Sequence, residues 1–405
     1  MKITDVKSAV IGNNIVIRIV TDKGIDGYSQ IESNKDYVRP LIPYFKSMIL
    51  GCDPTNVEDV LRRMRRASAF KPWGKVFSSI EMALWDVAGK DAGVPVYKLL
   101  GGKVRDRVRV YNGSFIDKGA PHRPADGNPL SPEQRGENIL HLNEIPEGFT
   151  IVKTAAFWHT RFYTSDDAYN TYYQPDAAFS TRSGSLLTEK ALNESIEFIA
   201  RIKKIVGDRV GLAFDVGPGF MPTDIIRLAK AVEPYNVMWL EDSIAGDYTP
   251  YTMADVYRDV TTSTSTPIHT GEQIFLRQNF MDLIEKRAVD IIGPDPADVG
   301  GLAELKWITE YADLHGILMA PHGTFDGVFG MAALTHVCST MPQNYIAYEF
   351  PGLNPDFWMD IVDGVPNDFL RDGHVKVWDL PGVGVTFNES KAEKYLNSED
   401  KGFFL

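Results

Sequence analysis

Short runs of apolar residues alternate with helix-like segments over the central part of the chain. The runs are "VRVYNGSF", "FTIVKTAAF", "VGLAFDVG", "VMWLEDS", "PIHTGEQ", "VDIIGPD", "ILMAPHG" and "YIAYEF". Continuous apolar runs of this kind are typical of parallel strands that are buried on both faces. Eight of them in βα alternation predict an α/β fold with a closed (β/α)₈ TIM-like barrel over residues 108–350. A doubly wound open sheet is the alternative.

The first 107 residues have a different pattern. "ITDVKSAVIG" and "NIVIRIVTDKG" alternate apolar and polar residues on either side of "GNN", which predicts a β-hairpin. Ile80, Ala83, Leu84 and Val87 then mark one face of a helix. We therefore expect an N-terminal α+β capping domain over residues 1–107. Residues 351–405 are rich in Gly, Pro and Asp and are expected to return over the barrel and the capping domain.

The composition is that of a globular protein with a large core, since 44% of the residues are hydrophobic and 24% are charged. A net charge of −12 argues against nucleic acid as a partner, because nucleic-acid binding depends mainly on Lys and Arg. Cys52 and Cys338 are too few for a disulfide framework, and "MKITDVKSAV" lacks the apolar core of a signal peptide. We expect a cytoplasmic protein that does not associate with a membrane.

A polar residue closes each of the last six apolar runs. These residues are Asp215, Glu241, Glu272, Asp295, His322 and Glu349. They recur at intervals close to one βα unit of a barrel, which is roughly 30 residues long. All six should therefore lie at the C-terminal face of the barrel, where barrel enzymes have their active sites.

Three of these acids predict a metal site. Asp215, Glu241 and Glu272 follow consecutive strands and supply only oxygen ligands, which suits a hard divalent cation such as Mg²⁺. We expect Asp242 to be a helix-facing acid or a cap and not a further ligand, because side chains alternate along a regular strand. The sequence contains no His-x-His or His-Glu-x-x-His, so the usual zinc-hydrolase signatures are absent.

In order along the chain, several motifs resemble those of the enolase superfamily, specifically its mandelate racemase-like group. "AFDVG", "WLEDS" and "TGEQI" are similar to the three metal-ligand strands of that group, and "IIGPDPADVGGLAE" with "APHG" to the strands of its Asp/His dyad. "SSIEMALWDVAGKDAGVPVYKLLGGKVRDRVRVY" and "LPGVGVTF" resemble the segments that lead into the barrel and close it. The resemblance covers nearly the whole chain and implies a homo-oligomer of two to eight subunits.

The resemblance implies that a base removes the proton α to a substrate carboxylate and that Mg²⁺ stabilises the enediolate. His322 would be the base, Asp295 would orient it and favour its charged form, and Glu349 would donate a hydrogen bond to the enediolate. Many relatives carry Lys-x-Lys on the second strand. Here Lys153 matches the first Lys, but Ala155 occupies the position of the second base. Lys153 is expected to neutralise the substrate carboxylate or to pair with the metal-site acids.

With a single base, the economical reaction is the dehydration of an aldonate or aldarate to a 2-keto-3-deoxy acid. This reaction is that of the acid-sugar dehydratases of the superfamily. One alternative is an epimerase, racemase or cycloisomerase that uses a second base from a loop, and another is a catalytically silent barrel that binds acid sugars. Candidate substrate contacts in the loops are Tyr28, Trp73, Lys75, His122, Trp158 and His159.

Overall fold

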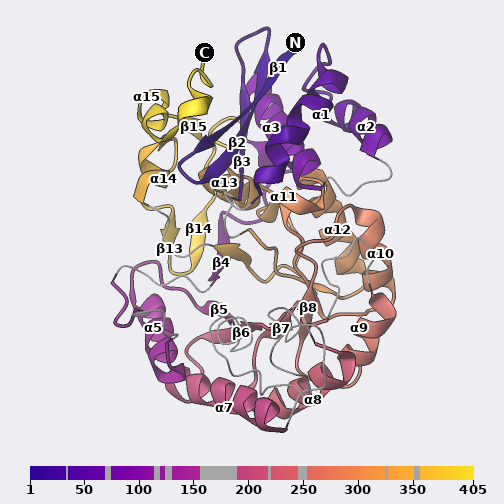
Figure 1. Cartoon of the computed structure of the whole chain (residues 1–405), viewed down its shortest axis with the longest axis vertical. Helices are drawn as coiled ribbons and strands as arrows, with labels where there is room; N and C mark the ends of the chain where they lie inside the picture. The colour runs from indigo at the N-terminus through magenta and orange to yellow at the C-terminus, as the bar shows by residue number, and fades with distance from the viewer. Residues whose placement is uncertain are drawn as a thin grey trace.

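The computed structural model describes residues 1–32, 35–68, 74–113, 119–123, 130–155, 189–217, 220–244, 253–323, 327–350 and 356–405. A three-stranded antiparallel sheet with its helices occupies one end of the molecule, and a larger, mainly parallel sheet surrounded by helices forms the rest (Figure 1). The first region is the capping domain and the second is the barrel.

The capping domain begins with an antiparallel sheet in the order β1 (Ile3–Ile11), β2 (Asn14–Thr21) and β3 (Gly27–Ile31). The predicted hairpin is confirmed, because β1 and β2 are joined by a two-residue turn in which Gly12 has a φ of 63°. Glycine is favoured at such a position, since a side chain disfavours the left-handed conformation. Most apolar residues of β1 and β2 are buried.

The helices of the capping domain are α1 (Ile42–Ile49), α2 (Val57–Ser68), α3 (Gly74–Ala92) and α4 (Val96–Leu99). Helix α3 packs between the sheet and the barrel, and its predicted apolar face is confirmed because Ile80, Ala83, Leu84 and Val87 are all fully buried. Its other face is buried too, and that face carries Lys75, Ser78 and Glu81. These polar side chains lie against the barrel.

Each of the eight apolar runs overlaps a strand. The strands are β4 (Arg107–Asn112), β5 (Ile151–Ala155), β6 (Gly211–Asp215), β7 (Trp239–Glu241), β8 (Ile268–Thr270), β9 (Ile291–Ile292), β10 (Leu318–Met319) and β11 (Tyr348–Phe350). Strands β4 to β10 pair in chain order, all parallel, and β11 pairs with β4.

Backbone hydrogen bonds connect the two ends of this ladder. The amide of Ile346 donates to the carbonyl of Met319 at 2.8 Å, and the amide of Glu349 donates to the carbonyl of Pro321 at 2.8 Å. These bonds join β10 to the chain that enters β11. In the part of the chain that the structure describes, the eight parallel strands therefore form a closed ring, as predicted for a (β/α)₈ barrel.

The helices α5 (Pro132–Glu144), α7 (Glu189–Val206), α8 (Pro222–Val232), α9 (Ala254–Thr261), α10 (Arg277–Glu285), α12 (Leu302–Leu314) and α13 (Gly327–Cys338) surround the strands (Figure 1). A short helix, α11 (Pro296–Val299), lies between β9 and α12. The barrel interior is filled by a separate buried cluster, whose larger members are Tyr111 and Trp239. The barrel is therefore a packed core beneath its C-terminal face.

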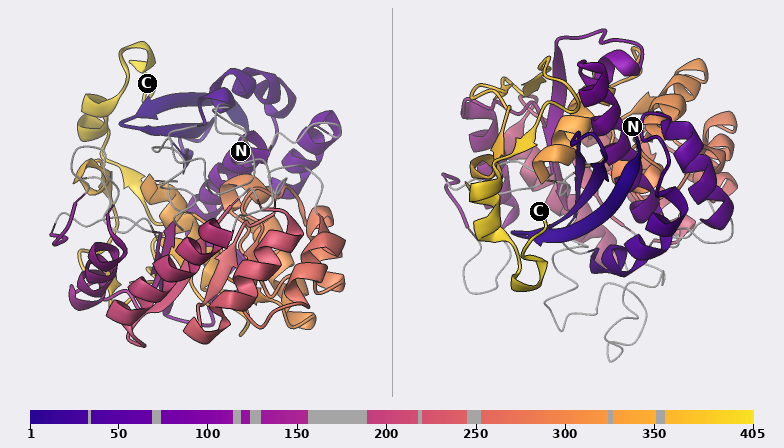
Figure 2. Two further views of the ribbon diagram at one scale, coloured as in Figure 1. Left: turned by 60° about the horizontal axis from the view of Figure 1, so that its bottom comes forward. Right: turned by 90° about the horizontal axis from the view of Figure 1, so that it is seen from above.

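The C-terminal segment contains α14 (Asp356–Asp360), β12 (Val362–Asp363), β13 (Leu370–Arg371), β14 (His374–Lys376), β15 (Thr386–Phe387) and α15 (Glu389–Ala392). Strand β14 pairs antiparallel with β4. Farther on, the segment lies along the capping domain (Figures 1 and 2). There the Arg18 guanidinium donates to the carbonyl of Phe403 at 2.6 Å, and the amide of Val10 donates to Asp400 Oδ2 at 2.8 Å. The predicted domain boundaries at residues 107 and 350 remain predictions.

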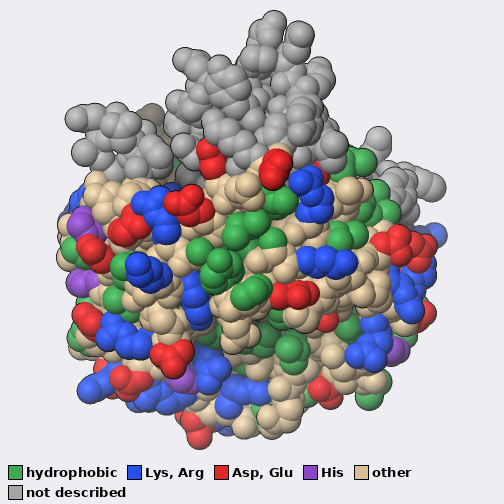
Figure 3. Space-filling model, turned by 90° about the horizontal axis from the view of Figure 1, so that it is seen from below, with side chains coloured by type: hydrophobic (Ala, Val, Ile, Leu, Met, Phe, Trp, Pro, Cys, Tyr) green, Lys and Arg blue, Asp and Glu red, His purple; other side chains and the backbone are tan. Residues whose placement is uncertain are grey.

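The surface carries charges of both signs. On the face shown in Figure 3, Lys and Arg side chains are interspersed with Asp and Glu side chains around scattered apolar patches. The net charge of −12 is therefore not gathered into a single acidic field on this face. Among the helices of the described residues, none combines the length and apolar character that a membrane crossing requires.

Candidate active site

The parallel pairing of the barrel strands brings the predicted acids to one end of the barrel. Asp215 is the last residue of β6, Glu241 is the last residue of β7, and the two pair in register. Glu272 lies two residues beyond β8, Asp295 is the N-cap of α11 after β9, and Glu349 lies within β11. Neighbouring parallel strands end on the same side, so these carboxylates converge on the C-terminal face of the barrel.

His322 lies in the middle of three of these carboxylates. Its Nδ1 is 2.6 Å from Asp295 Oδ2, and its Nε2 is 3.2 Å from both Glu272 Oε2 and Glu349 Oε2. Asp295 is fully buried, and its second oxygen, Oδ1, accepts a hydrogen bond of 2.6 Å from the amide of Ala297. The structure thus brings the predicted Asp295 and His322 together and orients the ring from the Nδ1 side.

The pKa values of this pair follow from its surroundings. Burial alone would lower the pKa of His322, but the charges of Glu272 and Glu349 and the hydrogen bond to Asp295 outweigh burial and raise the pKa well above its usual value. Burial alone would raise the pKa of Asp295, but Lys75 and the hydrogen bond with His322 bring the net pKa below its usual value. The carboxylates around the ring therefore control its protonation.

Lys153 of β5 also lies among the acids. Its Nζ is 2.7 Å from Glu241 Oε1, 3.1 Å from Glu349 Oε1 and 4.0 Å from Asp215 Oδ2, and the side chain is buried. Burial would lower the pKa of Lys153, but the charges of Glu241 and Glu349 raise it well above its usual value. The ion pairing with acids that were predicted to bind the metal is observed, and contact with a substrate carboxylate stays a prediction.

Two further residues fix Glu241. The indole Nε1 of Trp239 donates to Glu241 Oε2 at 2.7 Å, and the ring of Trp239 stacks on that of His269 with the centroids 5.3 Å apart. His269 Nδ1 is 3.5 Å from the same oxygen. Burial would raise the pKa of Glu241, but Lys153 and His269 lower it to about 2.

Neither Trp239 nor His269 was predicted from the sequence. A signal for both was available, because Trp239 lies two residues before Glu241 on the same side of β7, and His269 is the residue of β8 in register with Glu241.

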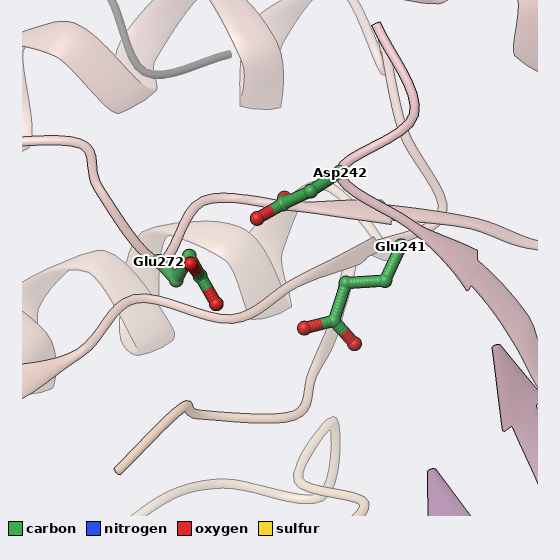
Figure 4. Close-up of side chains that lie close together, drawn as sticks. All are labelled: Glu241, Asp242 and Glu272. Atoms are coloured by element: carbon green, nitrogen blue, oxygen red, sulfur yellow. The ribbon is translucent and has the colours of Figure 1, made fainter. Parts of the chain in front are cut away.

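The carboxylates of Glu241, Asp242 and Glu272 form an acidic group, with one oxygen of each within 4.8 Å of the others (Figure 4). The expectation for Asp242 is therefore wrong. Asp242 has a φ of 49°, so the chain leaves β7 in the left-handed conformation and the alternation of side chains breaks there. Its Oδ1 accepts a hydrogen bond of 2.8 Å from the hydroxyl of Thr270, which holds the carboxylate in this position.

Asp215 lies beside this acidic group but is not part of it in the described structure. The chain just after Asp215 packs closely against the chain at Asp242. A Cβ added to Gly217 would lie 1.3 Å from the carbonyl oxygen of Asp242, so only glycine fits two residues after Asp215. The role of Asp215 as a metal ligand stays a prediction.

The donor set fits a hard divalent cation. Glu241, Asp242 and Glu272 are buried and offer only carboxylate oxygens, which are the ligands that Mg²⁺ prefers. Six carboxylates and two cationic side chains, Lys153 and His322, meet at this face in the part of the chain that the structure describes. Buried carboxylates require positive charge nearby, so the surplus of acids favours a bound cation.

The predicted substrate contacts lie elsewhere or are not described. Tyr28 borders a groove of about 500 Å³ whose lining residues include none of the acids above, and the exposed edge of His122 pairs with Glu137 of α5. Lys75 is buried and forms an ion pair with Asp298. The remaining three, Trp73, Trp158 and His159, lie outside the described residues.

Known proteins match the chain over almost its whole length. A family model described as the mandelate racemase / muconate lactonizing enzyme N-terminal domain matches residues 3–101, and one described as enolase C-terminal domain-like matches residues 142–391. A D-xylonate dehydratase from Haloferax volcanii is 30% identical, with 98% of this chain and 89% of that protein covered. A D-galactonate dehydratase from Ralstonia pickettii is 26% identical, with 92% and 88% covered.

The fold has close counterparts among solved structures. A mandelate racemase/muconate lactonizing enzyme-like protein from Rubrobacter xylanophilus superimposes with a TM-score of 0.81. It is 30% identical to this chain, and the match covers 98% of this chain and 97% of that one.

Proposed function

Because the chain belongs to the mandelate racemase and muconate lactonizing enzyme family of the enolase superfamily, we propose that it is a hydro-lyase that removes water from a sugar acid. The substrate class is supported by similar proteins named as dehydratases of D-xylonate and D-galactonate. The observation that carries the proposal is the Asp295–His322 pair facing the acidic group, combined with alanine at position 155.

His322 is the proposed base. Its Nδ1 faces Asp295, and its Nε2 faces Glu272 and Glu349. The charges of these acids raise the pKa of the ring, and a cation bound by Glu272 would offset them. The neutral ring, donating from Nδ1, would then present the lone pair of Nε2 to the substrate. A substrate carbon held beside Nε2 would lose its α-proton to that nitrogen. Asp295 stabilises the imidazolium that forms, because its carboxylate is ionised and in hydrogen-bond contact.

The negative charge that develops on the substrate carboxylate needs compensation. Bound at Glu241, Asp242 and Glu272, with Asp215 as a further ligand, Mg²⁺ would supply Lewis-acid stabilisation of that charge. Lys153 adds a fixed positive charge beside Glu241 and Glu349. Glu349, when protonated, would donate a hydrogen bond to the charged oxygen. The pH at which it does so depends on the bound cation and substrate.

Elimination then follows with the same ring acting as an acid. The electron pair left by the α-proton forms a carbon–carbon double bond as the bond from the β-carbon to its hydroxyl breaks. The proton on His322 Nε2 passes to the departing hydroxyl and gives water. The remaining enol tautomerises to a 2-keto-3-deoxy acid, so that one substrate yields one keto acid and one water.

A racemase or epimerase would need a second base on the other side of the substrate carbon. Ala155 occupies the position at which many relatives carry a lysine base, and its methyl side chain cannot exchange a proton. The sequence at this position therefore favours elimination over inversion.

The test is a panel of aldonic and aldaric acids incubated with the protein and Mg²⁺, with 2-keto acid measured. We expect at least one acid to lose water, with deuterium from D₂O at C3 of the product. Recovery of an acid that has kept its water, with inverted configuration and deuterium at the α-carbon, would favour an epimerase. Binding to wild type and His322→Asn alike, with no chemistry in either, would show a silent sugar-acid binder and contradict the proposal.

A further inference from the structure

We propose that Lys75 of the capping domain is a positioning residue that holds Asp295, and through it His322, in place for proton abstraction. The inference rests on the proposed function for its kinetic consequence. It assigns Lys75 a role different from the direct substrate contact that the sequence suggested.

Lys75 is the second residue of α3 and is 2% exposed. Its Nζ is 2.5 Å from Asp298 Oδ2, in the barrel, and 3.5 Å from Glu32 Oε2, in the capping domain. A buried cation with carboxylates on two sides has little freedom to move, because each displacement leaves a charge unpaired in a region of low dielectric constant. The ion pair therefore ties the start of α3 to α11.

Asp298 is coupled to Asp295 through one turn of backbone. The amide of Asp298 donates to the carbonyl of Asp295 at 3.0 Å, and the amide of Val299 donates to the same oxygen at 2.7 Å. The amide of Ala297 donates to the Asp295 carboxylate at 2.6 Å. A shift of Asp298 is thus passed to both the backbone and the side chain of Asp295.

The same face of α3 makes further contacts with this stretch of chain. Ser78 Oγ accepts from the amide of Gly300 at 2.9 Å, and the carboxylate of Glu81 accepts from the amides of Leu302 and Ala303 at 2.8 and 3.0 Å. A Cβ added to Gly74 would lie 2.6 Å from the carbonyl oxygen of Asp298, so the two segments pack directly. Helix α3 supports α11 and the start of α12 from one side.

The charge of Lys75 also acts on Asp295 at a distance. The charge of Lys75 favours the ionised form of the buried Asp295, together with the hydrogen bond and the charge of His322. Loss of this charge would therefore weaken the ionised partner of the base as well as loosen its support. A misplacement of a reacting group by about 1 Å can cost about 10²-fold in rate, so a distant support of this kind has a measurable effect.

The experiment compares Lys75→Met and Lys75→Arg with Lys90→Met. Lys90 lies on the same helix and forms a similar ion pair, 2.6 Å from Asp86, which does not involve α11. For Lys75→Met we expect kcat to fall on the order of 10- to 100-fold, with KM changed by less than about twofold. With substrate deuterated at the α-carbon, the isotope effect on kcat should increase. Lys75→Arg should recover most of the activity, and Lys90→Met should match wild type.

Asp298→Asn is the second variant, and it tests the same ion pair if Lys75→Met fails to fold. It removes one charge of the ion pair and keeps the size of the side chain, and we expect it to lower kcat in the same direction. A kcat for folded Lys75→Met or Asp298→Asn equal to that of wild type would overturn the proposal. So would equal losses in Lys75→Met, Lys75→Arg and Lys90→Met that follow their melting temperatures.

One readout does not require turnover. The proton on His322 Nδ1, hydrogen-bonded to Asp295, should give a downfield NMR signal that His322→Asn removes. In Lys75→Met this signal should shift or broaden, and in Lys90→Met it should not. An unchanged signal in Lys75→Met would overturn the positioning role. If wild type dehydrates no sugar acid while the signal responds as expected, the proposed function fails and the positioning role stands.

Discussion

Two buried histidines, His322 at the barrel mouth and His336 in α13, show how differently the fold uses the same side chain. His336 is fully buried; its Nε2 donates to the carbonyl of Val383 at 3.1 Å, and its Nδ1 accepts from the amide of Tyr97 at 3.4 Å. Burial is the main reason that its pKa falls to about 4. The pKa of His322 is raised because three carboxylates face its ring.

Burial has the same sign for both rings, so the neighbours decide between a structural and a chemical role. The backbone amide of Tyr97 donates to Nδ1 of His336, so the lone pair of that nitrogen is already used and cannot readily accept a second proton. That ring therefore joins α13 to α4 and to the C-terminal segment as a neutral side chain. His322 has acidic groups at both nitrogens and can gain and lose a proton, which general acid–base chemistry requires.

The largest expected effect is the loss of activity when His322 is substituted, which tests its chemical role. His322→Asn should lower the rate of 2-keto acid formation about 10³-fold, because the general base is lost while the size and polarity of the side chain are nearly kept. Dehydration assays on purified protein with the same melting temperature as wild type measure the effect. A variant that keeps turnover within tenfold of wild type would place the base elsewhere.

The second effect concerns His336 and the pH dependence of stability. Its pKa is about 4 in the folded state and near 6.5 in the unfolded chain, so the unfolded state binds more protons between these values. The contribution of neutral His336 is complete above pH 6.5 and is lost as the pH falls toward 4. Over this window His336 should account for about 3 kcal/mol of the free energy of unfolding.

Urea denaturation of wild type and His336→Asn at a series of pH values isolates this contribution. Between pH 4 and 6.5, the free energy of unfolding of wild type should rise more than that of the variant. If the free energy of unfolding changed with pH in the same way for both proteins, the pKa of His336 would not be lowered in the folded state. The contrast between the pKa values of His336 and His322 would then disappear.

Removal of the divalent cation should affect the surroundings of His322 and leave those of His336 unchanged. A cation present at about 100 times its dissociation constant stabilises the folded state by about 2.7 kcal/mol. Dialysis against EDTA should therefore lower the melting temperature, and added Mg²⁺ should restore it. The same treatment should leave NMR signals of His336 in place, and a shift confined to those signals would contradict the proposed metal site.

The smallest expected effect tests Asp242. Asp242→Asn removes one of the three converging charges and should weaken Mn²⁺ or Mg²⁺ binding about tenfold, measured by calorimetry on the purified protein. Asp290→Asn, at an acid in the loop before β9, serves as the matched control and should bind the cation as wild type does. Unchanged affinity in Asp242→Asn would return Asp242 to a structural role through its bond with Thr270.

The barrel and the positions of the acids could be predicted because both follow from repetition along the chain. Each buried parallel strand is a short apolar run, and each run ends at the same level of the barrel, so Asp215, Glu241 and His322 could be placed at one face from spacing alone. The pairing of His322 with Asp295 follows from the same register.

The features that could not be predicted depend on single backbone angles or on contacts between distant segments. One residue in the left-handed conformation, Asp242, turned a side chain that a regular strand would point outward. The environment of Lys75 depends on how α3 packs against α11, and no local pattern in either segment encodes that packing. Sequence periodicity specifies strands well and interdomain contacts poorly.

The contacts of the C-terminal segment with β1 and β2 have a consequence for the order of folding. Val10 and Arg18 find partners in Asp400 and Phe403, almost the full length of the chain away. Domains usually fold as they emerge during synthesis, but contacts over such a separation must wait for the distant segment. The capping domain, although made first, should reach its final stability only after the barrel has been synthesised, and the barrel should begin to fold beside an unfinished neighbour.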